Sequence, residues 1–138
     1  MKGELTTPTP ILIVDDHDRV RACMRELIHQ HQGLHVVGEA GDGRTAVELA
    51  RQLRPQIVLM DFVMPVMDGA RATQLITQDF PHIKVIGFSS IAAAEKLMVS
   101  SGAFLYFEKG NITDELPKAI KRAVYSEPVV VSPTPCEA

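Results

Sequence analysis

The chain has 138 residues, of which 46% are hydrophobic and 22% are charged, and its formal net charge is −3 at pH 7. This length suits one domain with a single core, and the composition is that of a soluble globular protein rather than a disordered or fibrous one. The negative charge argues against the broad basic surface that nonspecific binding to nucleic acid requires, so we expect no direct DNA binding by this chain.

Residues 1–9 lack the apolar segment of a secretory signal peptide. They are predicted to form a flexible arm. Short apolar runs rich in β-branched and aromatic residues follow, and such runs are typical of strands buried on both faces of a sheet. These runs are ILIV (11–14), LHVVGEA (34–40), IVLM (57–60), IKVIGF (83–88) and FLYF (104–107).

Segments with helical spacing of apolar residues separate the runs. The first helix is predicted to bury Cys23 and Met24, and the second and third end before Pro55 and Pro81. The fourth helical segment has the weakest pattern.

In the last helix, Thr113 is the predicted N-cap and Pro117 falls near the first turn, where proline is tolerated. Strands that alternate with helices predict an α/β fold with a parallel sheet, helices on both faces and right-handed crossovers. Residues 10–126 form the expected domain, and the proline-rich residues 127–138 form a tail or the start of a linker.

Polar residues follow four of the predicted strands. Asp15 and Asp16 come directly after the first, and Asp61 comes after the third. The carboxyl ends of parallel strands meet at one edge of a sheet, where such folds bind ligands, so we expect these acids to share a pocket. Ser89 and Lys109 follow the fourth and fifth strands and are expected at the same edge.

Clustered carboxylates repel one another and need a compensating cation. Mg²⁺ suits this set, because it binds one or two carboxylates and completes its shell with waters and phosphate oxygens. With a hydroxyl from Ser89 and an ammonium from Lys109, the pocket is suited to phosphoryl transfer onto an aspartate.

Four segments resemble the signature segments of a response-regulator receiver domain of two-component signalling. They are ILIVDDHDRVR, IVLMDFVMPVMDG, KVIGFSS and GAFLYFEKG. The resemblance covers residues 10 to 126 and implies a flavodoxin-like, doubly wound fold with five parallel strands in the order 2-1-3-4-5.

The resemblance also implies a role for each site residue. Asp61 would accept the phosphoryl group, and Mg²⁺ would be held by Asp15, Asp16, Asp61 and the backbone carbonyl of Val63. Ser89 would bond the phosphoryl group and Lys109 would neutralise it. Tyr106 would move inward with Ser89 as an aromatic switch. The segment between Ser89 and Tyr106 is shorter than is usual for the family, so we expect a short or displaced fourth helix.

Finer details resemble the NarL/FixJ (LuxR-type) subfamily: DDH, serine at Ser89, KG at residues 109–110, and the VVVSP tail. By that resemblance, a sensor histidine kinase phosphorylates the chain, which acts as a cytoplasmic switch and not as an enzyme, without membrane association. Phosphorylation is expected to favour a homodimer. Transcription would be regulated through a C-terminal DNA-binding domain that does not follow in this chain.

Simpler readings remain for individual residues. Asp15 and Asp68 each suit a helix N-cap, and Ser89 could cap the next helix. Lys109 could lie on the surface, and Tyr106 could serve packing alone. Asp18 is expected to be a solvated helix start.

Two other functions stay open. One is a single-domain or phosphate-independent interaction module. The other is a Mg²⁺-dependent aspartyl phosphohydrolase, which is disfavoured because Val63 stands where a general acid is needed. Only two cysteines, Cys23 and Cys136, occur, which excludes a disulfide scaffold or zinc site and favours the cytoplasm.

Overall fold

A computed structural model describes residues 8–126. These residues form a five-stranded parallel sheet in the order β2-β1-β3-β4-β5. The strands are β1 (Thr9–Val14), β2 (Leu34–Ala40), β3 (Ile57–Asp61), β4 (Lys84–Ser89) and β5 (Leu105–Glu108). The predicted fold class and strand order are confirmed.

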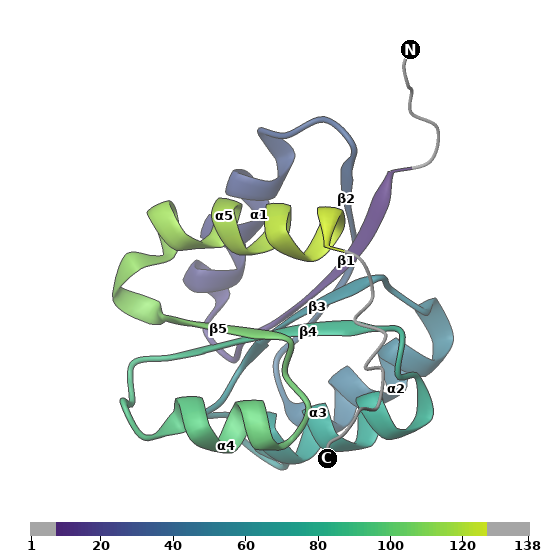
Figure 1. The fold of residues 1–138 in the computed structure, drawn as a ribbon, viewed down its shortest axis with the longest axis vertical. Helices are drawn as coiled ribbons and strands as arrows, with labels where there is room; N and C mark the ends of the chain where they lie inside the picture. Colours follow the sequence, from purple (N-terminus) through teal and green to yellow (C-terminus); the bar gives the residue numbers. More distant parts are fainter. Residues whose placement is uncertain (1–7, 127–138) are drawn as a thin grey trace, which may run out of the picture.

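Helices cover both faces of the sheet (Figure 1). One face carries α1 (Asp18–His29) and α5 (Ile112–Tyr125). The other carries α2 (Gly43–Leu53), α3 (Gly69–Asp79) and α4 (Ala94–Ser100). A 3-10 turn, η1 (Lys109–Asn111), joins β5 to α5. The short α4 agrees with the sequence expectation.

The strands separate two apolar clusters, one on each face. All five residues of β3 are buried, and the side chains of residues 57–60 enter the two clusters alternately. Leu12 and Val14 pack with α2 and α3, whereas Ile11 and Ile13 pack with α1 and α5. This explains why the strands appear in the sequence as continuous apolar runs.

The starts of the helices differ in how they are stabilised. The side chain of Asp42 accepts a hydrogen bond from Thr45 N, and that of Asp68 accepts one from Arg71 N, so both are N-caps. The prediction for Thr113 is wrong, because α5 begins at Ile112 with Asn111 as its N-cap. The preceding turn η1 leads directly into α5 and starts it without a side-chain cap.

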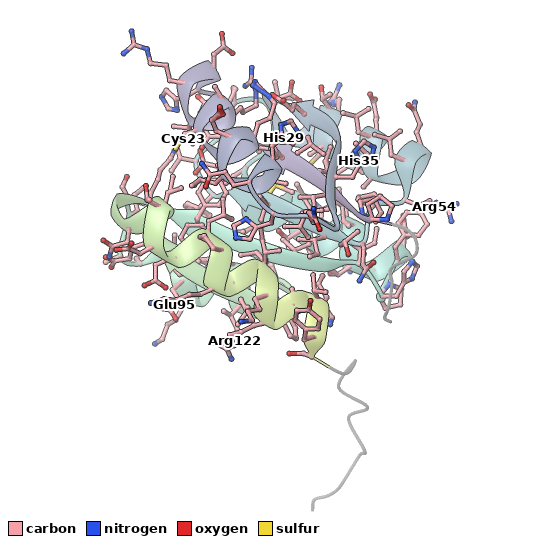
Figure 2. All side chains as sticks on the ribbon, turned by 90° about the horizontal axis from the view of Figure 1, so that it is seen from above. Cys23, His29, His35, Arg54, Glu95 and Arg122 are labelled. Atoms are coloured by element: carbon pink, nitrogen blue, oxygen red, sulfur yellow. The ribbon has the colours of Figure 1, made fainter. Side chains whose placement is uncertain are left out.

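Cys23 is also misplaced by the sequence prediction. It is exposed on α1 (Figure 2), whereas Met24 and Ile28 are buried. The helix turns about 100° per residue, so a neighbour of a core position can face solvent. Among the described residues, no helix is long and apolar enough to span a membrane.

Lys84 connects the start of β4 to the end of α5. Its Nζ donates to Ala123 O at 2.7 Å and to Ser126 O at 2.9 Å, and it lies 4.8 Å from the centre of the Phe104 ring. A cation is favourable at a helix C-terminus, where carbonyl groups lack partners. The expected N-terminal arm, except Pro8 and Thr9, and the expected tail with Cys136 lie outside the described residues; Thr9 already belongs to β1.

Candidate functional site

The carboxyl ends of β1, β3, β4 and β5 bring the predicted polar residues to one edge of the sheet. Asp15 directly follows β1, Asp61 and Ser89 are the last residues of β3 and β4, and Lys109 directly follows β5. Asp15, Asp61 and Ser89 are at most 2% exposed. Residues far apart in the sequence therefore meet because parallel strands end at a common edge.

Lys109 joins the two buried carboxylates of this edge. Its Nζ lies 3.2 Å from Asp61 Oδ2 and 2.9 Å from Asp15 Oδ2. The other oxygen of Asp61 accepts a hydrogen bond from the backbone N–H of Val63 at 3.3 Å. Asp61 thus meets a positive charge on one oxygen and a backbone dipole on the other.

Burial and charge set the ionisation of these groups. The pKa of Asp61 is raised from 3.8 to about 6, first by burial and then by the charge of Asp15, against the opposing effect of Lys109. Burial alone would lower the pKa of Lys109, but hydrogen bonding to Asp15 and the charges of Asp61 and Asp15 raise it above its ordinary value. Lys109 therefore stays protonated between the two acids.

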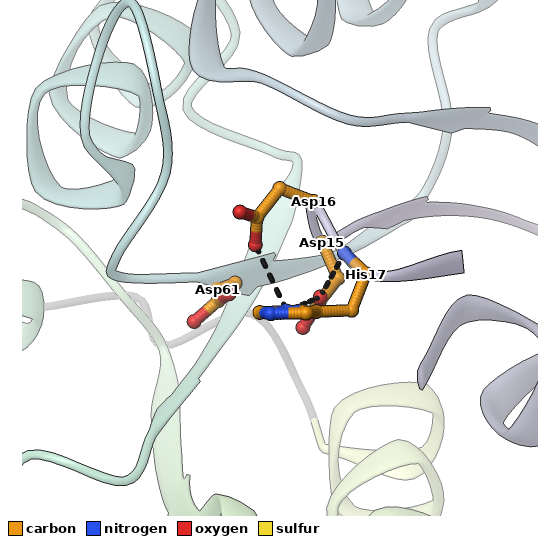
Figure 3. A group of neighbouring side chains, drawn as sticks. All are labelled: Asp15, Asp16, His17 and Asp61. Carbon is orange, nitrogen blue, oxygen red and sulfur yellow. Dashed lines mark hydrogen bonds and ion pairs between the residues drawn. The ribbon is translucent and has the colours of Figure 1, made fainter. Parts of the chain in front are cut away.

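Asp16 and His17 lie beside Asp15 and Asp61 (Figure 3). Asp16 is partly exposed, and its Oδ1 lies 3.1 Å from His17 Nδ1. One ligand atom from each of Asp15, Asp16, His17 and Asp61 lies within 4.8 Å of the others. The pocket therefore gathers ligands from two strand ends.

The donor set fits a hard divalent cation. It consists mainly of carboxylate oxygens, which Mg²⁺ prefers. Asp15 Oδ2 is buried and pairs with the Lys109 ammonium 2.9 Å away. A metal ion that binds this oxygen would share it with Lys109. The predicted use of the Val63 carbonyl stays a prediction.

Arg21 supports the acidic loop, and sequence reasoning missed it. Its Nη1 donates to the backbone carbonyl of Asp15 at 2.6 Å, and its Nε donates to Glu39 Oε1 at 3.2 Å. It also pairs with Asp18, the exposed first residue of α1. The signal in the sequence was an arginine one helical turn after His17, whose carbonyl accepts the Arg21 N–H.

Ser89 and Tyr106 both bond to the loop between β4 and α4. Ser89 Oγ accepts the Ile91 N–H at 3.0 Å, so it does not cap α4. The Tyr106 hydroxyl is 3.3 Å from both Ser89 O and Ile91 O. Burial raises the pKa of Tyr106, and its ring packs against the α2, α3 and α4 cluster.

Two glycines let the loop after Asp61 pack closely. A Cβ on Gly69 would lie 2.0 Å from the Asp61 carbonyl oxygen, and one on Gly43 would lie 2.1 Å from Met67 O. Gly69 N donates to Phe62 O at 2.8 Å. The glycines thus hold α3 and α2 against the loop that carries Val63.

Residues 11–121 match the response regulator receiver domain. This chain belongs to the response-regulator receiver family. The matched range covers every strand end that contributes to the pocket and most of α5. The clustered acids and the lysine at these strand ends therefore lie within the part of the chain that matches the receiver domain.

Relatives agree with this assignment. VraR of Staphylococcus saprophyticus, a response regulator protein, is 33% identical over 88% of this receiver and 59% of its own length. The receiver thus spans about three fifths of the curated relatives it matches.

Two solved structures extend the likeness to the fold. The response regulator domain of Thermotoga maritima CheB superposes with a TM-score of 0.81 and 30% identity, over 87% of this chain and 98% of that one. A LuxR-family two-component response regulator from Aurantimonas has a TM-score of 0.78 and 34% identity, over 83% and 84%. The likenesses support a receiver of the NarL/FixJ type.

Proposed function

We propose that this receiver accepts a phosphoryl group on Asp61 from a sensor histidine kinase in a Mg²⁺-dependent reaction. One observation carries the proposal: Lys109 Nζ lies 3.2 Å from Asp61 and 2.9 Å from Asp15 at the ligand-binding edge of the sheet. Phosphoryl transfer depends on positioning and charge neutralisation rather than on complex covalent chemistry. Lys109 supports both requirements, because it lies beside Asp61 and carries a positive charge.

Asp61 is the nucleophile in this proposal. One of its carboxylate oxygens forms a bond to phosphorus while the bond from phosphorus to the histidine nitrogen of the kinase breaks. A pKa of about 6 leaves Asp61 ionised above neutral pH, as a nucleophile must be. Lys109 stays protonated and offsets the charge of the phosphoryl group.

The residues present fit a magnesium ion. Asp15, Asp16, Asp61 and the Val63 carbonyl would hold it, and when bound it would neutralise phosphoryl oxygens and orient the donor. Arg21 fixes the backbone of Asp15, the first of these residues. The buried carboxylates of Asp15 and Asp61, which share the ammonium of Lys109, support this assignment.

Ser89 and Tyr106 would transmit the change. To bond the phosphoryl group, Ser89 Oγ would have to give up the Ile91 N–H that it accepts now. The Tyr106 hydroxyl bonds the carbonyls of the same two residues, so a shift of this loop would alter its position. Phosphorylation would then shift an existing conformational equilibrium.

The role of the whole protein follows from its relatives. They include a LuxR-family response regulator, and the curated relatives extend beyond the length that this chain covers. We therefore infer regulation of transcription in the cytoplasm through a C-terminal DNA-binding domain, with a homodimer formed on phosphorylation. A receiver that acts alone is the alternative.

Incubation with acetyl phosphate and Mg²⁺ tests the proposal, with intact-mass spectrometry as the readout. We expect one added phosphoryl group in the wild type and none in Asp61→Asn. Asp68→Asn is the matched control, because Asp68 only caps α3 and asparagine also serves as an N-cap. Labelling that persists in Asp61→Asn would refute the assignment, and steady release of phosphate from a phosphomonoester would favour a phosphohydrolase.

A further inference from the structure

The acidic pocket contains a histidine that the proposed function leaves unused. His17 Nδ1 lies 3.2 Å from Asp15 Oδ1 and 3.1 Å from Asp16 Oδ1, so it stands between the two carboxylates (Figure 3). The His17 side chain is 65% exposed, so an ion from solution can reach it. Its backbone N–H donates to the same Asp15 oxygen at 2.8 Å, which holds the residue against the pocket.

A second observation supports a bound cation at this group. Asp15 is fully buried, and its Oδ2 shares the Lys109 ammonium, 2.9 Å away, with the buried Asp61. Asp61, from another strand, contributes a further oxygen, and the ligand atoms of all four residues lie within 4.8 Å of one another. The cluster therefore combines a histidine nitrogen with three carboxylates, and the two buried ones share the Lys109 ammonium.

The spacing of these atoms suits direct coordination. Metal bonds of roughly 2.0 to 2.2 Å place neighbouring ligands of an octahedral ion about 3 Å apart. Both distances from His17 Nδ1 to the carboxylates have this value. The same atoms that now contact one another are thus spaced as neighbours in one coordination shell.

The types of ligand atom decide which ion this cluster binds more tightly. Mg²⁺ prefers oxygen, whereas imidazole suits first-row transition metals such as Co²⁺ and Zn²⁺. We infer that His17 is a metal ligand that gives this pocket a preference for imidazole-binding divalent ions over Mg²⁺, greater than its carboxylates alone would give. The inference rests on the proposed function in one respect, since it assigns the cation to the same pocket.

Calorimetric titration with Co²⁺ and with Mg²⁺ tests this selectivity at one fixed pH. In His17→Asn we expect the Kd for Co²⁺ to rise at least about 10-fold, and the Kd for Mg²⁺ to change by less than about 3-fold. His35→Asn is the matched control, because His35 is an exposed histidine on β2. It should leave both constants unchanged.

A second readout needs no variant. NMR of the wild-type protein with Co²⁺ should show contact shifts of the His17 ring protons, which need a bond from the ring nitrogen to the ion, and none for the His35 ring. This measurement decides the question if His17→Asn fails to fold, as judged by circular dichroism. Equal losses of Co²⁺ and Mg²⁺ affinity, or a His17 ring without such shifts, would overturn the inference.

The two proposals fail separately. Wild-type protein that is labelled on Asp61 with Mg²⁺ but shows no His17 signal with Co²⁺ refutes only the imidazole ligand. Protein that shows the His17 signal but takes no label refutes only the phosphoacceptor role.

Discussion

The Lys109 ammonium lies 3.2 Å from Asp61 Oδ2, and this contact places a positive charge beside a carboxylate that is only 2% exposed. Because Asp15 is also buried and lies 2.9 Å from the same ammonium, one cation serves two acids. The pair is therefore incompletely compensated, and the stability of the fold should depend on the charge of this pocket.

The first prediction concerns the pH dependence of Asp61. Its pKa is raised from 3.8 to about 6, so between these values the unfolded chain has lost a proton that the folded chain retains. The contribution of this group to stability is thus present at low pH and is lost as the pH rises through about 6. Without metal, Asp61→Asn should be more stable than wild type at pH 8, by about 1–2 kcal/mol after allowance for solvent screening.

Urea unfolding in the presence of a chelator measures this difference. At pH 4 the two proteins should differ little, because Asp61 is then protonated in the folded state. Asp79→Asn serves as the control, since among the described residues the Asp79 side chain pairs only with the exposed Arg51. A variant less stable than wild type at pH 8 would contradict the prediction.

Replacement of Lys109 should have the opposite effect. Lys109→Met leaves Asp15 and Asp61 side by side without a counter-charge, and breaking a buried ion pair in this way costs about 2–4 kcal/mol. The loss should be largest at pH 8 and smaller at pH 5, where Asp61 takes up a proton. Urea midpoints at both pH values provide the measurement, and an equal loss at both would rule out the electrostatic explanation.

Arg21 should affect cation binding without touching the cation. It donates to the backbone carbonyl of Asp15, whereas Arg25 donates to Glu39 and makes no such bond. Loss of a group that orients a ligand typically weakens metal binding about 10-fold. Calorimetry should therefore show a Kd for Mg²⁺ about 10-fold higher in Arg21→Gln and nearly unchanged in Arg25→Gln. Similar constants for both variants would show that Arg21 does not position the loop.

Gly69 should be intolerant of any side chain. The Cβ of Gly69→Ala would lie 2.0 Å from the Asp61 carbonyl oxygen, which is backbone and cannot move without shifting β3 or α3. We expect a loss of about 2–4 kcal/mol in the free energy of unfolding. Gly110→Ala is the control, because no atom of residues 8–126 lies within 4 Å of its Cβ, and it should cost less than about 1 kcal/mol. Equal unfolding midpoints for Gly69→Ala and Gly110→Ala would show that the loop after Asp61 moves aside without loss of stability.

Much of this architecture was predictable because strand burial and strand ends leave a local signal. The run IVLM ends at Asp61, and this combination of apolar residues and an acid is visible without the fold. The order of strands and the meeting of Asp15, Asp61 and Lys109 followed from parallel-sheet topology and from resemblance. The structure agrees with both.

The parts that were missed depend on tertiary contacts. Nothing in the sequence showed that α5 is started by η1 rather than by Thr113. The periodicity that placed Met24 in the core could not resolve the side on which Cys23 falls. The bond from Arg21 to the Asp15 carbonyl joins a helix to a loop, and its formation depends on how the two pack.

The hydrogen bonds from Lys84 to the end of α5 link that helix end to the acidic pocket. β4 carries Lys84 at its first residue and Ser89 at its last, and a strand of six residues is about 17 Å long from end to end. The strand has the acidic pocket at one end and, through the bonds of Lys84 to Ala123 and Ser126, the end of α5 at the other. The end of α5 is therefore tied to the same strand that brings Ser89 to the pocket.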